Sequence, residues 1–285
     1  MDFLRHERLR TQQPATSPRR SRRAGRVSPT FFQRFECKYL VDPLMVASMR
    51  KYLEPFVRAD RFTRNNQDGR YCVSSLYLDS ADLALYQQTQ AGEKDRFKLR
   101  IRTYDDDPSH PAYLEVKRKV NNVVHKRRVG LGRDDARTLI MRQTPGTVLS
   151  RLTETRRADA EYFSHHMEHL SALPAIRVQY MREAYEATGN EPVRVTLDSE
   201  LRHAVTLNDD LGHTSGDWID TPVSGIIIEI KFTERFPWWV KEFIRGFELR
   251  QQSVPKYILS VEHALRRRAT SEVSLAGLAR PVMNF

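Results

Sequence analysis

Polar and apolar residues alternate with a period of two along the segment Arg96–Arg128. Successive side chains of a β-strand point to opposite faces, so each alternating run predicts a strand with its charges on one side. Polar connections at Asp105–Pro111 and Asn121–Asn122 suit hairpin turns. The segment therefore predicts three neighbouring strands whose shared face carries Lys98, Arg100, Arg102, Glu115, Lys117, Lys119, Lys126 and Arg128.

Seven of these eight charges are positive, and two interpretations of such a face are open. The simpler one is a solvated outer surface, because antiparallel sheets commonly have one wet face. Wet faces usually mix the two signs, however, since like charges on neighbouring strands destabilise their pairing. The second interpretation is an anion-binding face, on which a polyanion supplies the missing negative charge.

The rest of the chain predicts about five further strands and a small number of amphipathic helices. Strands are expected at residues 31–41, 71–79, 175–187, 193–198 and 224–232, and helices at 43–56, 82–90, 132–143, 148–170, 237–249 and 256–268. Most strands carry polar residues at every second position, so the few helices would cover their apolar faces. The pattern indicates a barrel with a charged interior. Because burying an unpaired ion costs several kcal/mol, such a lumen must be open to water and suited to an anion.

Composition divides the 285 residues into a basic N-terminal segment and a mildly basic remainder. The net charge is +11, of which residues 1–30 contribute +6 through eight arginines. We expect residues 1–30 to be a disordered basic tail, residues 31–268 to be the folded domain and residues 269–285 to be a C-terminal tail. Two cysteines without zinc-binding spacing suit a reducing cytoplasm, and no apolar run is long enough to span a membrane.

Other phosphate and metal chemistries lack their sequence patterns. No P-loop is present, and Gly130-Leu131-Gly132 lacks the third glycine of a dinucleotide site. The histidines of the HHMEH segment lack the glutamate of a zinc protease motif, which favours a solvated helix face there. Nucleic-acid binding is not expected, because aromatic residues are not interleaved with the cations as a stacking platform requires.

Nine short motifs in series carry a family resemblance. They are FECKYLV at 35–41, SLYLD at 75–79, KLRIRTY at 98–104, LEVKRK at 114–119, KRRV at 126–129, RVQYMREAY at 177–185, VRVTLDSEL at 193–201, IIIEIKF at 226–232 and VPKY at 254–257. In this order and spacing they resemble the VTC domain of polyphosphate polymerases. That domain belongs to the triphosphate tunnel metalloenzyme superfamily, which also contains the CYTH enzymes. The resemblance covers about residues 31–265.

The resemblance implies an α+β fold, namely an eight-stranded antiparallel β-barrel tunnel with flanking helices. It implies a lumen that holds ATP or another nucleoside triphosphate together with a divalent metal, Mn²⁺ or Mg²⁺. The γ-phosphate would pass to a growing inorganic polyphosphate chain. The alternatives are a tunnel triphosphatase, which hydrolyses nucleoside or inorganic triphosphate, and a non-catalytic module that binds polyphosphate or nucleotide.

The resemblance also implies roles for individual residues. Those at the reacting phosphates are Lys38, Arg100, Arg102 and Lys117. Those that bind phosphate are Lys119, Lys126, Arg128, Arg177, Arg182, Arg194, Lys231 and Lys256. Tyr180 would contact the nucleotide, Glu229 would be the main metal ligand, and Glu115 and Glu36 would be lesser metal ligands. One departure is Arg34, which stands where the CYTH enzymes have the first of two alternating glutamates, and it argues against thiamine-triphosphatase and adenylate-cyclase activities.

Overall fold

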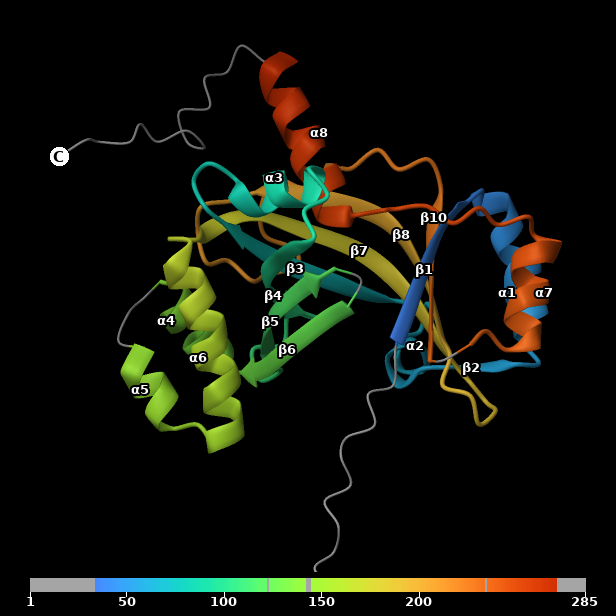
Figure 1. Cartoon of the computed structure of the whole chain (residues 1–285), viewed down its shortest axis with the longest axis horizontal. Helices are drawn as coiled ribbons and strands as arrows, with labels where there is room; N and C mark the ends of the chain where they lie inside the picture. The colour runs from blue at the N-terminus through green and yellow to red at the C-terminus, as the bar shows by residue number, and fades with distance from the viewer. Residues whose placement is uncertain (1–33, 122, 142–144, 234, 271–285) are drawn as a thin grey trace, which may run out of the picture. The chain divides into compact units, whose positions relative to one another are not determined.

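One continuous antiparallel sheet organises the chain (Figure 1). The computed structural model describes residues 34–121, 123–141, 145–233 and 235–270. The predicted N-terminal tail and the residues after Thr270 lie outside this range. The strands are β1 (Arg34–Val41), β2 (Val57–Ala59), β3 (Tyr71–Asp79), β4 (Asp95–Thr103), β5 (Ala112–Val120), β6 (Val123–Leu131), β7 (Leu173–Ala187), β8 (Arg194–Val205), β9 (Ile219–Asp220) and β10 (Ile226–Thr233). The helices are η1 (Pro43–Met45), α1 (Val46–Leu53), α2 (Arg61–Asn65), α3 (Ala84–Gln90), α4 (Arg133–Ile140), α5 (Pro145–Ser150), α6 (Glu154–His169), α7 (Trp238–Gly246) and α8 (Lys256–Thr270).

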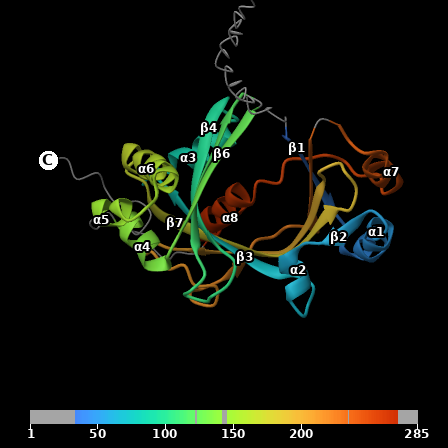
Figure 2. The same ribbon diagram turned by 90° about the horizontal axis from the view of Figure 1, so that it is seen from below.

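Eight strands form the main path of the sheet, in the order β1-β10-β8-β7-β3-β4-β5-β6. Every pairing is antiparallel, and the short strands β2 and β9 are added beside β7 and β8. This confirms the predicted α+β class and the eight-stranded antiparallel tunnel sheet. The sheet curls so that β4–β6 rise on one side and β1 and β10 on the other (Figure 2). Within the described residues the edge strands β1 and β6 do not pair, so backbone hydrogen bonds do not close the ring.

The alternation of side chains gives the sheet an apolar outer face, and helices cover it in two places. Leu99 and Leu114 are buried against Phe163 of α6 in one core. Ile228 is buried against Met49 of α1 and against α7 in the other. The alternate residues of the same strands therefore point into the concave side of the sheet.

Helix α8 packs on the concave side of the sheet rather than on an outer face (Figure 2). Its Tyr257 and Val261 are buried with Ile176 and Val178 of β7. Asp79, at the end of β3, holds this arrangement together. Its carboxylate accepts the backbone N–H groups of α3 residues 85 and 86 at 2.8 and 3.0 Å, and the hydroxyl of Tyr257 as well. The helix therefore fills part of the concave side and brings Lys256 to the rest of it.

Several elements differ from the sequence prediction. The predicted helix at 148–170 is two helices, α5 and α6, because the guanidinium of Arg157 donates to the carbonyls of Leu149 and Ser150 at 3.0 and 3.3 Å and so replaces their helical partners. The strand predicted at 193–198 continues to Val205, and β9 lies in a stretch where no strand was predicted. The short elements β2 and α2 were not predicted.

Replacing Asp79 with Ala tests the tie between α3, β3 and α8. The change leaves two buried N–H groups and a buried phenol without their acceptor, so we expect the free energy of unfolding to fall by about 3 kcal/mol. Urea denaturation measures this, with Asp82→Ala at an exposed position as the control. Equal stability of the two variants would contradict the assigned role.

Candidate functional site

The concave side of the sheet beside α8 gathers charged side chains, which we call the tunnel face. The strand residues among them point to this side because they alternate along each strand with the buried apolar residues of the outer face. Its cations are Lys38, Lys98, Arg100, Arg102, Lys117, Lys126, Arg128, Arg182, Lys231 and Lys256, and its carboxylates are Glu36, Glu115, Asp198 and Glu229. Cations therefore outnumber carboxylates ten to four in this set, and the excess requires an external anion.

Glu229 of β10 lies at the centre of the most highly charged group. One of its carboxylate oxygens is 3.1 Å from Lys256 Nζ and 3.3 Å from Lys38 Nζ. The other is 3.2 Å from Lys231 Nζ and 3.8 Å from a guanidinium nitrogen of Arg182. Burial opposes ionisation of this carboxyl, but the four cations outweigh burial and hold its pKa well below the usual range.

Asp198 of β8 is a second carboxylate beside Glu229 and is fully buried. It accepts the guanidinium of Arg182 through both oxygens at 2.6 Å, and Lys256 Nζ lies 2.7 Å away. Burial opposes its ionisation, yet these two cations lower its pKa. Asp198 was absent from the predicted site, although it alternates with Thr196 and Arg194 on the same strand. Asp198 thus helps to compensate the charges of Arg182 and Lys256, which also contact Glu229.

Glu115 is the counter-charge of strands β4–β6. Its side chain is fully buried and lies 2.7 Å from Arg100 Nε, 2.6 Å from Lys126 Nζ and 3.4 Å from Arg128 Nε. Despite burial, Arg100 and its neighbours hold the pKa of Glu115 well below the usual range. Burial in turn lowers the pKa of Lys126 to about 8, even with this partner.

Glu36 connects the two sides of the curled sheet. It lies on β1, 3.2 Å from Lys38 Nζ and 3.9 Å from Lys231 Nζ, and it reaches Lys117 of β5 at 3.4 Å. Burial opposes its ionisation, but Lys117, Lys38 and Lys231 lower its pKa to about 2. A side-chain ion pair therefore spans the tunnel where the backbone leaves the ring open.

Two tunnel cations, Lys98 and Arg102, have no carboxylate within 4 Å among the described residues. Arg102 donates instead to Ser75 Oγ at 3.1 Å. Burial and the repulsion of Lys38 and Lys117 lower the pKa of Lys98 to about 8. Lys98 was missing from the predicted site, although it begins the alternating run to which Arg100 and Arg102 belong.

Tyr77 adds an unusually acidic phenol to the tunnel face. It accepts a hydrogen bond from Arg100 Nη1 at 3.2 Å, and its ring stacks on Tyr257 at 4.6 Å between centroids. Burial would raise its pKa, but Arg100, Arg102 and Lys98 lower it to about 8. The SLYLD motif contained this residue, yet nothing in the motif alone indicated its cationic surroundings.

Three other predicted residues lie at or beside the tunnel face. Tyr180 is buried, with Lys256 Nζ 4.8 Å and the Arg182 guanidinium 5.1 Å from its ring centroid. Lys119 follows Lys117 at the next inward position of β5 and is half-buried. Arg194 is already satisfied by Asp60 at 2.7 Å and by Glu186 at 3.0 Å, so it is less available to a phosphate than the cations above.

Arg177 lies on the opposite face of β7, which contradicts its prediction as a tunnel cation. It is in register with Leu76 and Ala204 of the outer face. Its guanidinium donates to Asp210 at 2.8 Å and to the carbonyl oxygen of Ser215 at 2.6 Å, and so anchors the loop before β9. Gly216 permits this approach, because its φ is 99° and a Cβ there would lie 1.8 Å from Arg177 Nη2. Arg177 stands an odd number of residues from Tyr180 and Arg182 on a β7 segment whose pairing with β3 is unbroken, so the period of two puts it on the opposite face, which motif position did not reveal.

The three predicted metal ligands do not form a preformed metal centre. Among the residues that the structure describes, no group of three or more His, Cys, Asp or Glu side chains is placed to hold a metal ion. Three ammonium groups lie within 3.3 Å of the Glu229 oxygens. These carboxylates fit a divalent metal only when phosphate oxygens supply most of its ligands and offset the ammonium charges.

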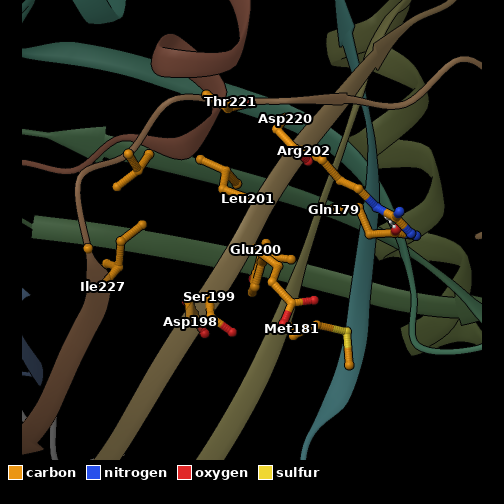
Figure 3. Close-up of a pocket in the computed structure, with 13 residues that line it drawn as sticks. Gln179, Met181, Asp198, Ser199, Glu200, Leu201, Arg202, Asp220, Thr221 and Ile227 are labelled. Atoms are coloured by element: carbon orange, nitrogen blue, oxygen red, sulfur yellow. Dashed lines mark hydrogen bonds between the residues drawn. The ribbon is translucent and has the colours of Figure 1, made fainter. Parts of the chain in front are cut away.

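A separate cavity of about 430 Å³ lies beside β8 (Figure 3). It lies where the strand paired with β8 changes from β10 to β9. It does not coincide with the group of cations and shares only Tyr180 and Asp198 with the tunnel face. The tunnel face is therefore assigned from the positions of its charged side chains, and the cavity is a separate feature beside it.

The curled antiparallel sheet and its cationic concave face define a tunnel-fold protein whose tunnel suits an anion. The family model described as VTC domain matches residues 33–265, so the chain belongs to the VTC domain family. No curated protein matches the chain significantly. No helix in the described part of the chain is both long and apolar enough to cross a membrane.

Solved structures with a similar fold have little sequence identity to this chain. One is the Hippeastrum protein HpAC1, for which a dominant triphosphatase activity is described. It has a TM-score of 0.44 and 15% identity over 81% of this chain and 96% of that chain. Another is the PH1819 protein of Pyrococcus horikoshii OT3, with a TM-score of 0.41 and 11% identity over 82% of this chain and 99% of that chain.

The low pKa of Lys98 predicts that anion binding depends on pH. An anion favours the charged ammonium, so affinity for inorganic tripolyphosphate should be highest below pH 8 and should fall as pH rises through 8, by about tenfold between pH 7 and 9. Calorimetry at pH 8 in buffers of different ionisation enthalpy would detect proton uptake on binding. Lys98→Arg, which stays charged, should reduce that uptake, whereas Lys94→Arg at an exposed position should not. Identical uptake in both variants would refute the assignment to Lys98.

The outer position of Arg177 predicts a structural rather than a phosphate-binding role. Arg177→Met removes a buried guanidinium from its partners, so we expect the free energy of unfolding to fall by about 3 kcal/mol. Tripolyphosphate affinity measured below the unfolding transition should change less than about twofold, since the side chain does not face the tunnel. Arg182→Met serves as the comparison and should weaken binding. A large loss of tripolyphosphate affinity in Arg177→Met would show instead that Arg177 takes part in phosphate binding.

Proposed function

We propose that this protein is a metal-dependent polyphosphate polymerase that transfers the γ-phosphate of ATP, or of another nucleoside triphosphate, to a growing inorganic polyphosphate chain. The observation that carries the proposal is the tunnel face, on which ten cations surround four carboxylates. Membership of the VTC domain family supports it. We assign the reaction to the cytoplasm, where ATP is available and where Cys37 and Cys72 would stay as the free thiols seen here.

Phosphoryl transfer needs in-line positioning and neutralised oxygens more than covalent chemistry. Arg100 and Arg102 offer planar guanidinium forks that match phosphate oxygens, and Lys38 and Lys117 add point charges from the facing strands. In the absence of phosphate, Glu115 and Glu36 hold three of these four cations in position. An entering phosphate chain would therefore meet cations that are already oriented, which lowers the cost of reorganisation.

A divalent metal, Mn²⁺ or Mg²⁺, would enter with the phosphates. Glu229 would hold it, with Glu36 as a further carboxylate ligand, since the two share Lys38 and Lys231. When bound, the metal would supply charge neutralisation at the phosphate oxygens. Lys38 and Lys231 would then move their ammonium groups from the carboxylates toward the phosphates.

The basicity of the tunnel carboxylates favours transfer to phosphate over hydrolysis. Water must lose a proton to attack, and a base with a very low pKa removes that proton poorly. Glu36, Asp198 and Glu229 all have lowered pKa values, because cations surround them. The terminal phosphate of a polyphosphate chain is already an anion and needs no base. The same carboxylates would therefore serve a polymerase well and a hydrolase poorly.

A tunnel triphosphatase is the second candidate, and Tyr77 is the observation that favours it. With a pKa of about 8, its phenolate is available near neutral pH as a base for water. Hydrolysis by this route should accelerate between pH 7 and pH 9 and should be lost in Tyr77→Phe. Polymer formation without that dependence would remove this candidate.

Incubation of the purified protein with ATP and manganese tests the proposal. We expect ADP and long-chain polyphosphate, and Glu229→Gln should slow their formation by about 100-fold, the scale seen when one preorganised electrostatic contact is lost. Tripolyphosphate binding should persist in this variant. Glu242→Gln, at an exposed position of α7, is the matched control.

Three outcomes of that incubation separate the candidates. Free phosphate without polymer would identify a triphosphatase. Binding of triphosphate without turnover, under the same conditions, would identify a non-catalytic module. Full polymerase activity in Glu229→Gln would refute the assignment of Glu229 but not the polymerase itself.

A further inference from the structure

The cavity beside β8 arises from irregularities in three neighbouring strands (Figure 3). The pairing of β7 with β8 shifts register between Gln179 and Met181. On β8, Glu200 has a φ of 53°, which turns the strand locally away from regular pairing. The pairing of β10 with β8 ends at Ile227, which is opposite Asp198. The next neighbour, β9, pairs with β8 only at Arg202 and His203. The wall of the tunnel is therefore interrupted here, and the cavity occupies the interruption.

The lining of the cavity does not suit phosphate. Two carboxylates, Glu200 and Asp220, line it besides Asp198, while Arg202 is its only cation among the described lining residues. The guanidinium of Arg202 is already used, because it donates to Gln179 Oε1 at 2.6 Å, as Figure 3 shows. Asp198 and Glu200 are paired with cations outside the lining, so an additional anion would find no available cation among the described lining residues. A neutral group with hydroxyls to donate would instead find acceptors.

An apolar wall faces these acceptors. Leu201, Val223 and Ile227 line the cavity, and Leu201 and Ile227 are buried. The volume of about 430 Å³ lies within the range of roughly 300–1,000 Å³ that is usual for small-molecule sites. The cavity thus offers contact area to a flat apolar group and carboxylates to a hydroxylated one.

The cavity is adjacent to the phosphate-binding cations. Tyr180 and Asp198 belong both to the cavity and to the tunnel face. Asp198 is held by Arg182 and Lys256, two of the cations that would grip a triphosphate. A ligand that occupies both places must join an anionic chain to a neutral, hydroxylated and partly apolar group, and a nucleoside triphosphate has this composition.

We propose that this cavity takes the nucleoside of the substrate. The base lies against Leu201, Val223 and Ile227, and the ribose hydroxyls donate to Asp220 or Glu200, as ribose hydroxyls do to carboxylates in other nucleotide sites. The triphosphate extends past Tyr180 to Lys256 and Arg182. This assignment rests on the proposed function and deepens it, because it makes the phosphate donor a nucleotide rather than inorganic triphosphate.

The experiment compares the affinities for two probes, a non-hydrolysable nucleoside triphosphate and inorganic tripolyphosphate, both with manganese. Val223→Trp fills the cavity from a half-exposed position, so we expect its nucleotide Kd to rise by about tenfold or more, the equivalent of about 1.4 kcal/mol. Its tripolyphosphate Kd should stay within about twofold of the wild type, because that ligand does not enter the cavity. Val205→Trp, at an exposed position of β8 outside the cavity, is the control and should change neither affinity.

A second variant keeps the test decisive if Val223→Trp fails to fold. The double variant Asp220→Ala with Glu200→Ala should abolish the preference for a ribonucleotide over its 2′,3′-dideoxy form and should leave tripolyphosphate binding unchanged. Equal effects of Val223→Trp on both probes, or no effect on either, would overturn the nucleoside assignment. A wild-type protein that binds neither probe would instead overturn the proposed function.

Discussion

Repulsion among the tunnel cations is the interaction on which the rest of this structure depends. Each strand of the eight-stranded path except β3 and β8 brings at least one cation to the tunnel face, and like charges on neighbouring strands destabilise a sheet. Glu36, Glu115, Asp198 and Glu229 offset this repulsion, and each contacts at least two cations. The compensation is incomplete, because the tunnel face has more cations than carboxylates. The remaining positive charge makes the tunnel suited to anions.

The same repulsion explains where the stabilising contacts of the fold lie. The tunnel face can contribute little apolar burial, so the sheet is held from outside by α6 on β4–β6 and by α1 and α7 on β1 and β10. On the concave side, α8 supplies apolar contact at Ile176 and Val178, where β7 carries no charge. Asp79 fixes that helix and so fixes the position of Lys256. Stability and charge are thus separated between the two faces of one sheet.

Most of this arrangement was predictable from the sequence, because a period of two determines which side chains share a face. The strands, the antiparallel tunnel and the cations of β4–β6 followed from that period and from the order of the motifs. Arg177 was placed wrongly because the resemblance assigned it by motif position, whereas the period of two, unbroken along β7 from Ile176 to Arg182, puts it on the face opposite Arg182. The cavity was missed because it depends on which strand pairs with β8 at each point. Asp198, by contrast, shares the phase of Arg194 and Thr196, so its face was open to prediction.

The four carboxylates connect folding to chemistry. A tunnel of cations alone would resist folding, whereas a tunnel with equal numbers of both signs would not attract a polyanion. Carboxylates that are each surrounded by several cations satisfy both requirements, and their lowered pKa values keep them ionised across the physiological range. In the function proposed above, the strong pairing that stabilises the tunnel would also make these groups poor bases, and it would so disfavour the attack of water on a bound phosphate chain. The counter-charges needed to fold the tunnel are therefore the same groups that would direct the phosphate toward an anionic acceptor.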